Sequence, residues 1–230
     1  RTVILFGGSG NDVLSADGDL FGDSGNDTLV SGPSANVLAG GSGNDSLFAG
    51  PGDDTIDADE GNDLIDGGTG SDLVSFLAAP TRAGRGVKVN LRTGSARGSG
   101  TDRLIAIEHL TGTPFDDVLT GNDFPNVLRG GPGRDRVSGQ GGNDALDGGE
   151  GNDSLRGGND NDSLIGGAGI DSLLGDAGFD EMITDLIDKV HQCERTVVPT
   201  DTTWRAIGPV GDLEGNPIAG VGQAWENTHV

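Results

Sequence analysis

A nine-residue unit of the form Gly-Gly-x-Gly-x-Asp-x-Leu-x recurs through most of this chain of 230 residues, and its clearest copy runs from Gly40 to Phe48. We number the positions of the unit from one to nine, so that the aspartate is at position six and the leucine at position eight. A nine-residue period does not return a side chain to one face of a 3.6-residue helix, whereas a turn followed by a short strand does return it to one side of a sheet. The repeat therefore predicts stacked turn-and-strand units.

Position six carries aspartate in two long series with a constant spacing of nine residues. Asn36 and Asn126 replace the aspartate in two copies, and one shortened copy has Gly18 at this position. The series predict a carboxylate at the same place in successive turns. The aspartates at position six are Asp12, Asp27, Asp45, Asp54, Asp63, Asp72, Asp117, Asp135, Asp144, Asp153, Asp162, Asp171 and Asp180.

Position eight is apolar in every copy, which predicts a side chain that points into a core each time. A disordered acidic linker would share the composition, with its 44 glycines, but would not keep this pattern. Positions one, two and four are mostly glycine because turns there need backbone conformations that side chains penalise. The residues at position eight are Leu14, Leu20, Leu29, Leu38, Leu47, Ile56, Ile65, Val74, Leu119, Leu128, Val137, Leu146, Leu155, Leu164, Leu173 and Met182.

Through these residues the chain resembles the RTX, or hemolysin-type, calcium-binding repeat family. The resemblance covers residues 7–75 and 112–183. It implies an all-β fold, a parallel β-roll or β-solenoid, in which successive units alternate between two facing sheets. It also implies that several Ca²⁺ ions are held by the thirteen aspartates named above, each ion shared between one turn and the turn two units later. The implied pairs are Asp45 with Asp63, Asp54 with Asp72, Asp135 with Asp153, Asp144 with Asp162, Asp153 with Asp171, and Asp162 with Asp180.

Several copies depart from the pattern. Asn36 and Asn126 offer a neutral oxygen, so we expect weaker sites there. A larger residue replaces the position-four glycine in three turns, which we expect to be poorer ligands. Replacement at position two is expected to be milder. The residues concerned are Phe115, Phe124 and Asp160 at position four, and Thr113, Asn122 and Gln140 at position two.

Physical chemistry favours calcium independently of the resemblance. Aspartates stacked at the ~4.8 Å strand spacing repel one another by ~1 kcal/mol per pair in bulk water, and by more where water is excluded. A divalent cation reverses that repulsion, and carboxylate and carbonyl oxygens suit Ca²⁺ better than Mg²⁺. The net charge of −23 agrees with this interpretation. The alternative, that aspartates only cap turns, stays open for Asp12 and Asp117.

Residues 76–111 separate the two arrays and are predicted to form a β insertion of wider coils that bind no calcium. Six basic residues lie there, and we expect them on the outward face of a sheet. Nucleic acid is not an expected partner, because the chain is strongly acidic and lacks aromatic residues interleaved with basic ones. The six residues are Arg82, Arg85, Lys88, Arg92, Arg97 and Arg103.

The predicted organisation has five parts: a first array at 1–75, the insertion at 76–111, a second array at 112–183, a C-terminal cap strand at 184–199, and a tail or the start of a further module at 200–230. Cys193 is the only cysteine, so no internal disulfide is possible. The sequence starts at Arg1 without an initiator methionine or signal peptide, and we expect a mature or excised fragment.

No catalytic motif is evident: the chain has three histidines, no His-Glu-x-x-His and no Gly-x-Ser-x-Gly. It has no transmembrane stretch either. We therefore expect a non-enzymatic, monomeric, calcium-dependent folding and stabilising module of a secreted bacterial protein, outside the cell or at its surface. One alternative is an adhesin or ice-binding solenoid, and another is an accessory domain of a secreted protease or lipase whose catalytic part lies elsewhere.

Overall fold

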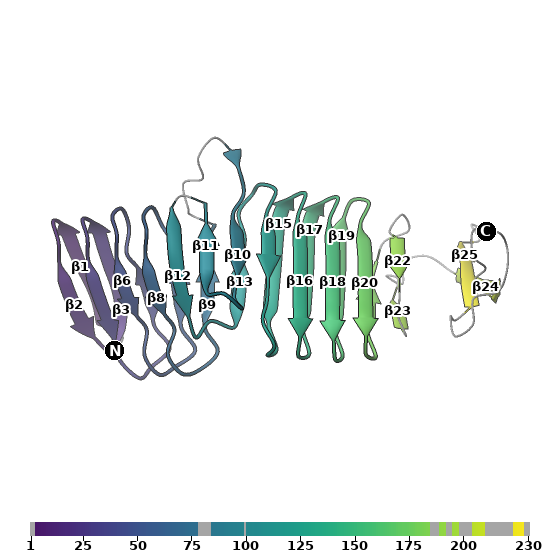
Figure 1. Ribbon diagram of the computed structural model, residues 1–230, viewed down its shortest axis with the longest axis horizontal. Coiled ribbons are helices and arrows are strands. Elements are labelled where there is room, and N and C mark those ends of the chain that lie inside the picture. The colour runs from purple at the N-terminus through teal and green to yellow at the C-terminus, as the bar shows by residue number, and fades with distance from the viewer. Residues whose placement is uncertain are drawn as a thin grey trace.

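The computed structural model describes residues 3–77, 84–98, 100–184, 189–191, 195–197, 204–209 and 223–227. The chain winds into a long β-solenoid whose strands stack along one axis (Figure 1). The described residues contain no α-helix, and none of their segments could cross a membrane as an apolar helix. The expected β-roll is confirmed.

Two sheets face each other along the roll, and the chain passes from one to the other at each turn. Sheet one has 11 strands, in the order β1 (Val3–Ser9), β3 (Gly18–Ser24), β5 (Val37–Ala39), β7 (Thr55–Asp57), β9 (Leu73–Ser75), β13 (His109–Thr111), β15 (Val127–Gly133), β17 (Ala145–Gly151), β19 (Ser163–Ala168), β21 (Glu181–Ile183) and β23 (Arg195–Val197). Sheet two has 12, in the order β2 (Val13–Ala16), β4 (Thr28–Ser31), β6 (Ser46–Phe48), β8 (Leu64–Asp66), β12 (Thr101–Ile105), β11 (Ser95–Arg97), β10 (Lys88–Asn90), β14 (Val118–Thr120), β16 (Arg136–Gly141), β18 (Ser154–Asn159), β20 (Ser172–Ala177) and β22 (Lys189–His191).

The parallel register places equivalent positions of the repeat side by side. Leu47 on β6 lies opposite Ile65 on β8, and Leu146 on β17 lies opposite Leu164 on β19. The two residues of each pair are 18 residues apart in the chain, which is one coil of two repeat units. Positions six, eight and one therefore face the interior, while positions seven and nine face outward.

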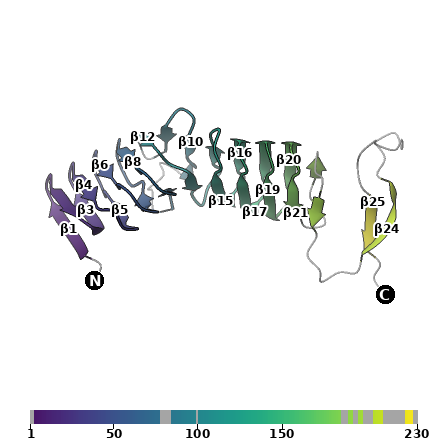
Figure 2. The same ribbon diagram turned by 90° about the horizontal axis from the view of Figure 1, so that it is seen from below.

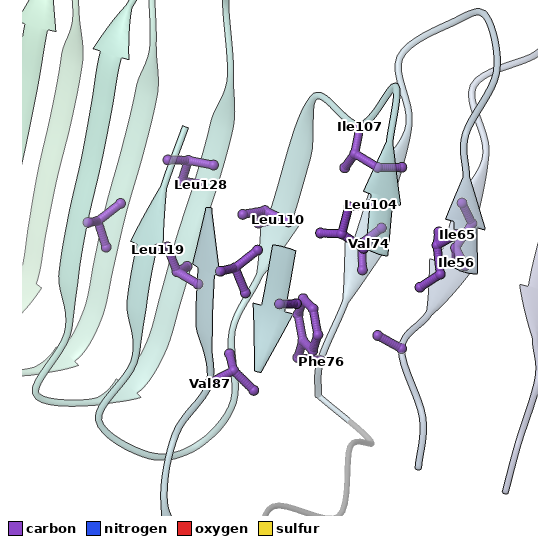
Figure 3. Packing of buried hydrophobic residues seen from close by; sticks show 14 of the residues in the cluster. Ile56, Ile65, Val74, Phe76, Val87, Leu104, Ile107, Leu110, Leu119 and Leu128 are labelled. Atoms are coloured by element: carbon purple, nitrogen blue, oxygen red, sulfur yellow. The ribbon is translucent and has the colours of Figure 1, made fainter. Parts of the chain in front are cut away.

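The core is a file of position-eight side chains between the two sheets. Leu29, Leu38, Ile56 and Leu128 are fully buried in one continuous cluster. Figure 3 shows how Leu119 and Leu128 project between the sheets beside Leu110 of the insertion. Each buried side chain contributes about 1.5–3 kcal/mol, but a file one side chain wide per strand gives the roll a thin core for its length.

The insertion reverses the chain within sheet two, which the nine-residue period did not predict. β10 pairs in parallel with β14, β11 pairs antiparallel with both β10 and β12, and β12 pairs in parallel with β8. β11 and β10 have no counterpart in sheet one, where β13 bonds directly to β9 and β15. Sheet two is therefore wider than sheet one at the insertion. Figure 2 shows from below that the inclination of the strands changes near β12 and β10.

Toward the C-terminus, β22 and β23 extend the two sheets by one strand each, where a single cap strand was expected. Cys193 lies outside the described residues. Beyond the roll, β24 (Trp204–Pro209) and β25 (Gln223–Asn227) form an antiparallel pair with an irregular register. The proposed domain boundaries stay predictions.

Candidate metal-binding columns

The position-six residues form two columns, one along each edge of the roll, at the turns that precede the strands of each sheet. All thirteen predicted aspartates lie in these columns, and most are buried. The column before sheet two contains Asp12, Asp27, Asp45, Asp63, Asp102, Asp117, Asp135, Asp153 and Asp171; the column before sheet one contains Asn36, Asp54, Asp72, Glu108, Asn126, Asp144, Asp162 and Asp180.

One carboxylate oxygen of each regular aspartate accepts a hydrogen bond from the backbone of the preceding coil. The Asp45 N–H donates to Asp63 Oδ1 at 2.8 Å, and the Asp135 N–H donates to Asp153 Oδ1 at 2.8 Å. At position five a second ladder runs in the opposite direction, since the Asn44 N–H donates to Asn26 Oδ1 at 2.8 Å. The turns are thus joined along the axis by side-chain acceptors.

In nine of these aspartates the second oxygen, Oδ2, is buried without a hydrogen-bond partner among the described residues. The two ion pairs found there, Arg92–Asp123 and Arg156–Asp176, do not involve position six. Leaving a buried polar group unpaired costs about 1–3 kcal/mol, and more when it is charged. These oxygens therefore fit a cation. They belong to Asp12, Asp27, Asp45, Asp54, Asp72, Asp135, Asp144, Asp153 and Asp162, and the amide oxygen of Asn36 is in the same state.

Backbone carbonyls from positions two and four project onto the turn of the next coil. A Cβ added to Gly151, which has φ +142°, would lie 1.5 Å from the carbonyl oxygen of Gly133. At position two, a Cβ on Gly149 (φ +102°) would lie 2.2 Å from the carbonyl oxygen of Gly131. Only glycine allows this approach. Among the described residues no three His, Cys, Asp or Glu side chains cluster as a metal site. Carboxylate and carbonyl oxygens of these turns are the hard donors that Ca²⁺ prefers.

The comparison with family models agrees with this donor set. The model of the RTX calcium-binding nonapeptide repeat (4 copies) matches residues 4–19, 21–56, 39–74, 111–146 and 147–182. The chain belongs to this family. Its repeats bind calcium in a β-roll, and they are a structural calcium-binding module typical of secreted bacterial proteins.

Other comparisons add little to the RTX assignment. No curated protein matches the chain significantly. Among solved structures, the extracellular lipase LipA from Serratia marcescens matches with 18% identity and a TM-score of 0.32, over 67% of this chain and 33% of the lipase chain. This RTX chain thus spans about a third of the length of that lipase.

Burial raises the pKa of several RTX aspartates when no metal is present. Desolvation, followed by the charges of neighbouring carboxylates, raises the pKa of Asp63 and of Asp135 to about 7, although a backbone N–H to each carboxylate opposes the shift. The pKa of Asp144 is raised to about 7 and that of Asp153 to about 6, again mainly by desolvation. The charged columns are therefore unfavourable by themselves.

Asp117 differs from the nine RTX aspartates with an unpaired Oδ2, because both of its carboxylate oxygens have protein donors. Oδ1 accepts from the Val87 N–H at 2.6 Å and from the Thr113 hydroxyl at 2.9 Å, and Oδ2 accepts from the Thr113 N–H at 2.6 Å. The Asn126 side chain also closes its own turn, because its Oδ1 accepts a hydrogen bond from the Asn122 N–H at 2.8 Å. The assignment of Asp117 as a ligand stays a prediction, and these contacts favour the alternative that Asp117 caps its own turn.

The backbone at position two differs between these turns. Thr113 and Asn122 are at position two without a positive φ, and the N–H of each donates to the position-six side chain. Gln140 is at position two with φ +84°, and the Oδ2 of Asp144 in its turn has no donor among the described residues. The Asn36 turn is an exception, because Gly32 at position two has no positive φ and Asn36 Oδ1 still has no donor there. At Thr113 and Asn122, a change that was expected to be mild accompanies a closed turn.

Changes at position four have different effects at Asp160 and at the two phenylalanines. A Cβ on Gly178 would lie 1.9 Å from the carbonyl oxygen of Asp160, close to the 1.5 Å between a Cβ on Gly151 and the carbonyl oxygen of Gly133. The carbonyl oxygens of Phe115 and Phe124 lie farther away, 2.8 Å from a Cβ built on Gly133 and 3.0 Å from one built on Gly142. The rings of Phe115 and Phe124 are exposed. The backbone is therefore consistent with poorer ligands at the Phe115 and Phe124 turns, but not at the Asp160 turn.

Two members of the columns were missed from the sequence. Asp102 Oδ1 accepts from the Asp63 N–H at 3.2 Å, and Glu108 Oε2 accepts from the Asp72 N–H at 3.0 Å. The Asp102 turn matches the unit as Gly98-x-Gly100-x-Asp102-x-Leu104, but it lies 39 residues after Asp63, which is not a multiple of nine. Glu108 is in register at 36 residues, but it follows a shortened turn that begins at Ala106.

Proposed function

We propose that this chain is a calcium-dependent folding and stabilising module of a secreted bacterial protein. Several Ca²⁺ ions would lie between successive turns of each column, each held by carboxylates of two coils and by turn carbonyls. The observation that supports this most strongly is the two columns of buried Oδ2 atoms without a protein donor. Any catalytic activity of the parent protein is assigned to other parts of it.

Calcium would control folding through the free energy of the columns. In the calcium-free roll, each ionised aspartate is desolvated beside like charges, and the thin core must also offset a backbone ordering cost of about 1–2 kcal/mol per residue. An ion that binds only the folded columns stabilises them in proportion to the logarithm of its concentration. The calcium-free chain is therefore expected to be largely disordered.

This dependence suits export from the cell. Extracellular calcium-binding modules have dissociation constants of about 10⁻⁴–10⁻³ M, well above cytosolic calcium. The chain would remain unfolded inside the cell and fold, coil by coil, as a monomer once outside. The family relationship supports a secreted context, and the site residues remain predictions.

A far-UV circular dichroism titration with calcium after chelation tests the proposal, with magnesium as the control ion. We expect a cooperative gain of β signal with calcium and none with magnesium, because Mg²⁺ needs a tighter octahedral shell and keeps its waters. A chelated protein that is already β-rich and does not respond to calcium would contradict the proposal.

A further inference from the structure

Basic side chains gather on the outer face of sheet two although the chain is strongly acidic. Across β12, β11, β10, β14, β16 and β18, which follow one another in the sheet, the exposed or half-buried positions contain no Asp or Glu. Asp102, the acid in these strands, is buried. Figure 1 shows the labelled strands of this set in succession along the roll. We define the basic face by its exposed cations, which are Lys88, Arg97, Arg103, Arg136 and Arg156.

The strand register brings these cations close together. Lys88 lies directly opposite Arg97, and the same row continues through Val118 to Arg136, two strand spacings (about 10 Å) from Lys88. Like charges directly opposite destabilise a sheet. Arg156 pairs with Asp176 at the end of the face, but no described acid forms an ion pair with the others. Without a bound anion, these adjacent like charges therefore destabilise sheet two.

Sheet one shows the opposite polarity. Its outward positions include Asp19, Asp57, Asp147 and Glu181, beside Arg129. The positive charge on sheet two is therefore segregated rather than scattered, which is the electrostatic pattern of a surface for an anionic partner.

We propose that the basic face binds an extended acidic polysaccharide. Hydroxyl and amide side chains occupy the outward positions between the cations, and these can hydrogen-bond to sugar hydroxyls while the cations contact carboxylate or sulfate groups. The second row of the face runs from Arg103 through Ser95, Asn90, Thr120 and Ser138 to Arg156.

The chemistry of the face favours a polysaccharide over other polyanions. Its outward positions carry no aromatic side chain, and single-stranded nucleic acids are bound by stacking on aromatic rings. Val118 and Ile105 are its large apolar members and both are half-buried, which is insufficient for insertion into a lipid surface. The net negative charge does not oppose binding once Ca²⁺ neutralises the columns, because charges beyond about 8 Å are screened at physiological salt.

Binding is tested with immobilised hyaluronan, which carries carboxylates, and dextran sulfate, with neutral dextran as the control, all in millimolar calcium. We expect both acidic polymers to bind, with an affinity that falls as salt rises, and neutral dextran not to bind. The tighter of the two identifies the preferred anionic group. The double variant Arg97→Gln, Arg136→Gln should bind about tenfold more weakly, since each exposed ion pair contributes up to roughly fivefold.

Two single variants that change the net charge equally test whether binding depends on the basic face or on the net charge of the chain. Arg136→Gln removes an exposed arginine from sheet two and Arg129→Gln removes one from sheet one, so only Arg136→Gln should weaken binding. Circular dichroism in calcium checks that each variant is folded, which keeps a failure of binding distinct from a failure of calcium-dependent folding. Equal losses in the two variants, equal binding of neutral dextran, or tighter binding to anionic vesicles or single-stranded DNA would overturn the proposal.

Discussion

Two turns of the same column, those that end in Asp153 and Asp117, satisfy the same carboxylate in different ways. In the Asp153 turn, one oxygen accepts a backbone N–H at 2.8 Å and the other has no donor among the described residues. In the Asp117 turn, Thr113 and Val87 supply donors to both oxygens. In this pair of turns the difference accompanies the backbone at position two: Gly149 has a positive φ, whereas Thr113 does not and its N–H donates to Asp117. Motif identity alone does not decide this difference.

Removing the two carboxylates should therefore have different consequences, and this is the largest effect we expect. Asp153→Ala deletes a ligand that faces two neighbouring coils, so the calcium concentration at the folding midpoint should rise about tenfold or more. Asp117→Ala should lower stability by about 1–3 kcal/mol through its lost hydrogen bonds, with little change in calcium dependence. Calcium titrations and urea unfolding of both variants measure this. An equal shift of the calcium midpoint in both would break the comparison.

The close approach of carbonyls can be tested at two position-four glycines. Gly151→Ala places a Cβ 1.5 Å from the Gly133 carbonyl oxygen, whereas Gly10→Ala, at φ +117°, meets nothing within 4 Å. Both variants carry the strain of a positive φ, which costs about 1–2 kcal/mol. Gly151→Ala should lose several kcal/mol in total, because its backbone must shift and displace a carbonyl that faces the next coil. Thermal unfolding in saturating calcium compares them, and equal losses would indicate that the carbonyl contact is unimportant.

The raised pKa values predict opposite pH responses with and without calcium. Without calcium, the folded roll binds more protons than the unfolded chain, because the pKa of Asp63, Asp135 and Asp144 is about 7 when folded, against an ordinary value of 3.8 for aspartate. Stability of the calcium-free roll is therefore greatest below pH 4 and falls as pH rises through 7. With calcium, protons compete for the same oxygens, so apparent affinity should fall as pH falls from 8 to 5.

The measurement is circular dichroism of chelated protein at a series of pH values, beside calcium titrations at the same values. Asp117→Ala is a comparison variant: it leaves Asp63 and Asp144 unchanged but removes the raised pKa of Asp117 and a neighbouring charge that raises the pKa of Asp135, so its pH dependence should be weaker than that of the wild type but have the same sign. A chelated protein whose β content rises with pH would contradict the assignment of desolvated, closely spaced carboxylates.

The sequence predicts the regular coils well and the insertion poorly, for physical reasons. Leu47 and Ile65 lie opposite each other because a fixed period and an apolar position eight leave one register in which the core is buried. The reversal through β10 and β11 is made by antiparallel pairing of strands that are consecutive in the chain, which a nine-residue period of parallel units does not encode. Asp102 was missed although its motif is nearly complete, because its turn lies outside the nine-residue spacing. The closure of Asp117 depends on the φ of Thr113, which residue type alone indicates only weakly.

Opening the Asp117 turn is the smallest effect we expect and the sharpest test of the role of position two. Thr113→Gly allows the positive φ found at Gly149 and removes the hydroxyl donor, so Asp117 Oδ2 should lose its N–H partner and become available to calcium. The lost hydrogen bonds should lower stability by about 1–2 kcal/mol at limiting calcium, and at saturating calcium the variant should recover that loss and bind more ions or bind them more tightly. Thr113→Ala is the matched control, since it removes the hydroxyl but disfavours a positive φ. It should lose stability without gaining calcium affinity. Isothermal titration calorimetry on both variants measures the difference, and a gain in both would assign the closure of the turn to the hydroxyl of Thr113 rather than to its backbone.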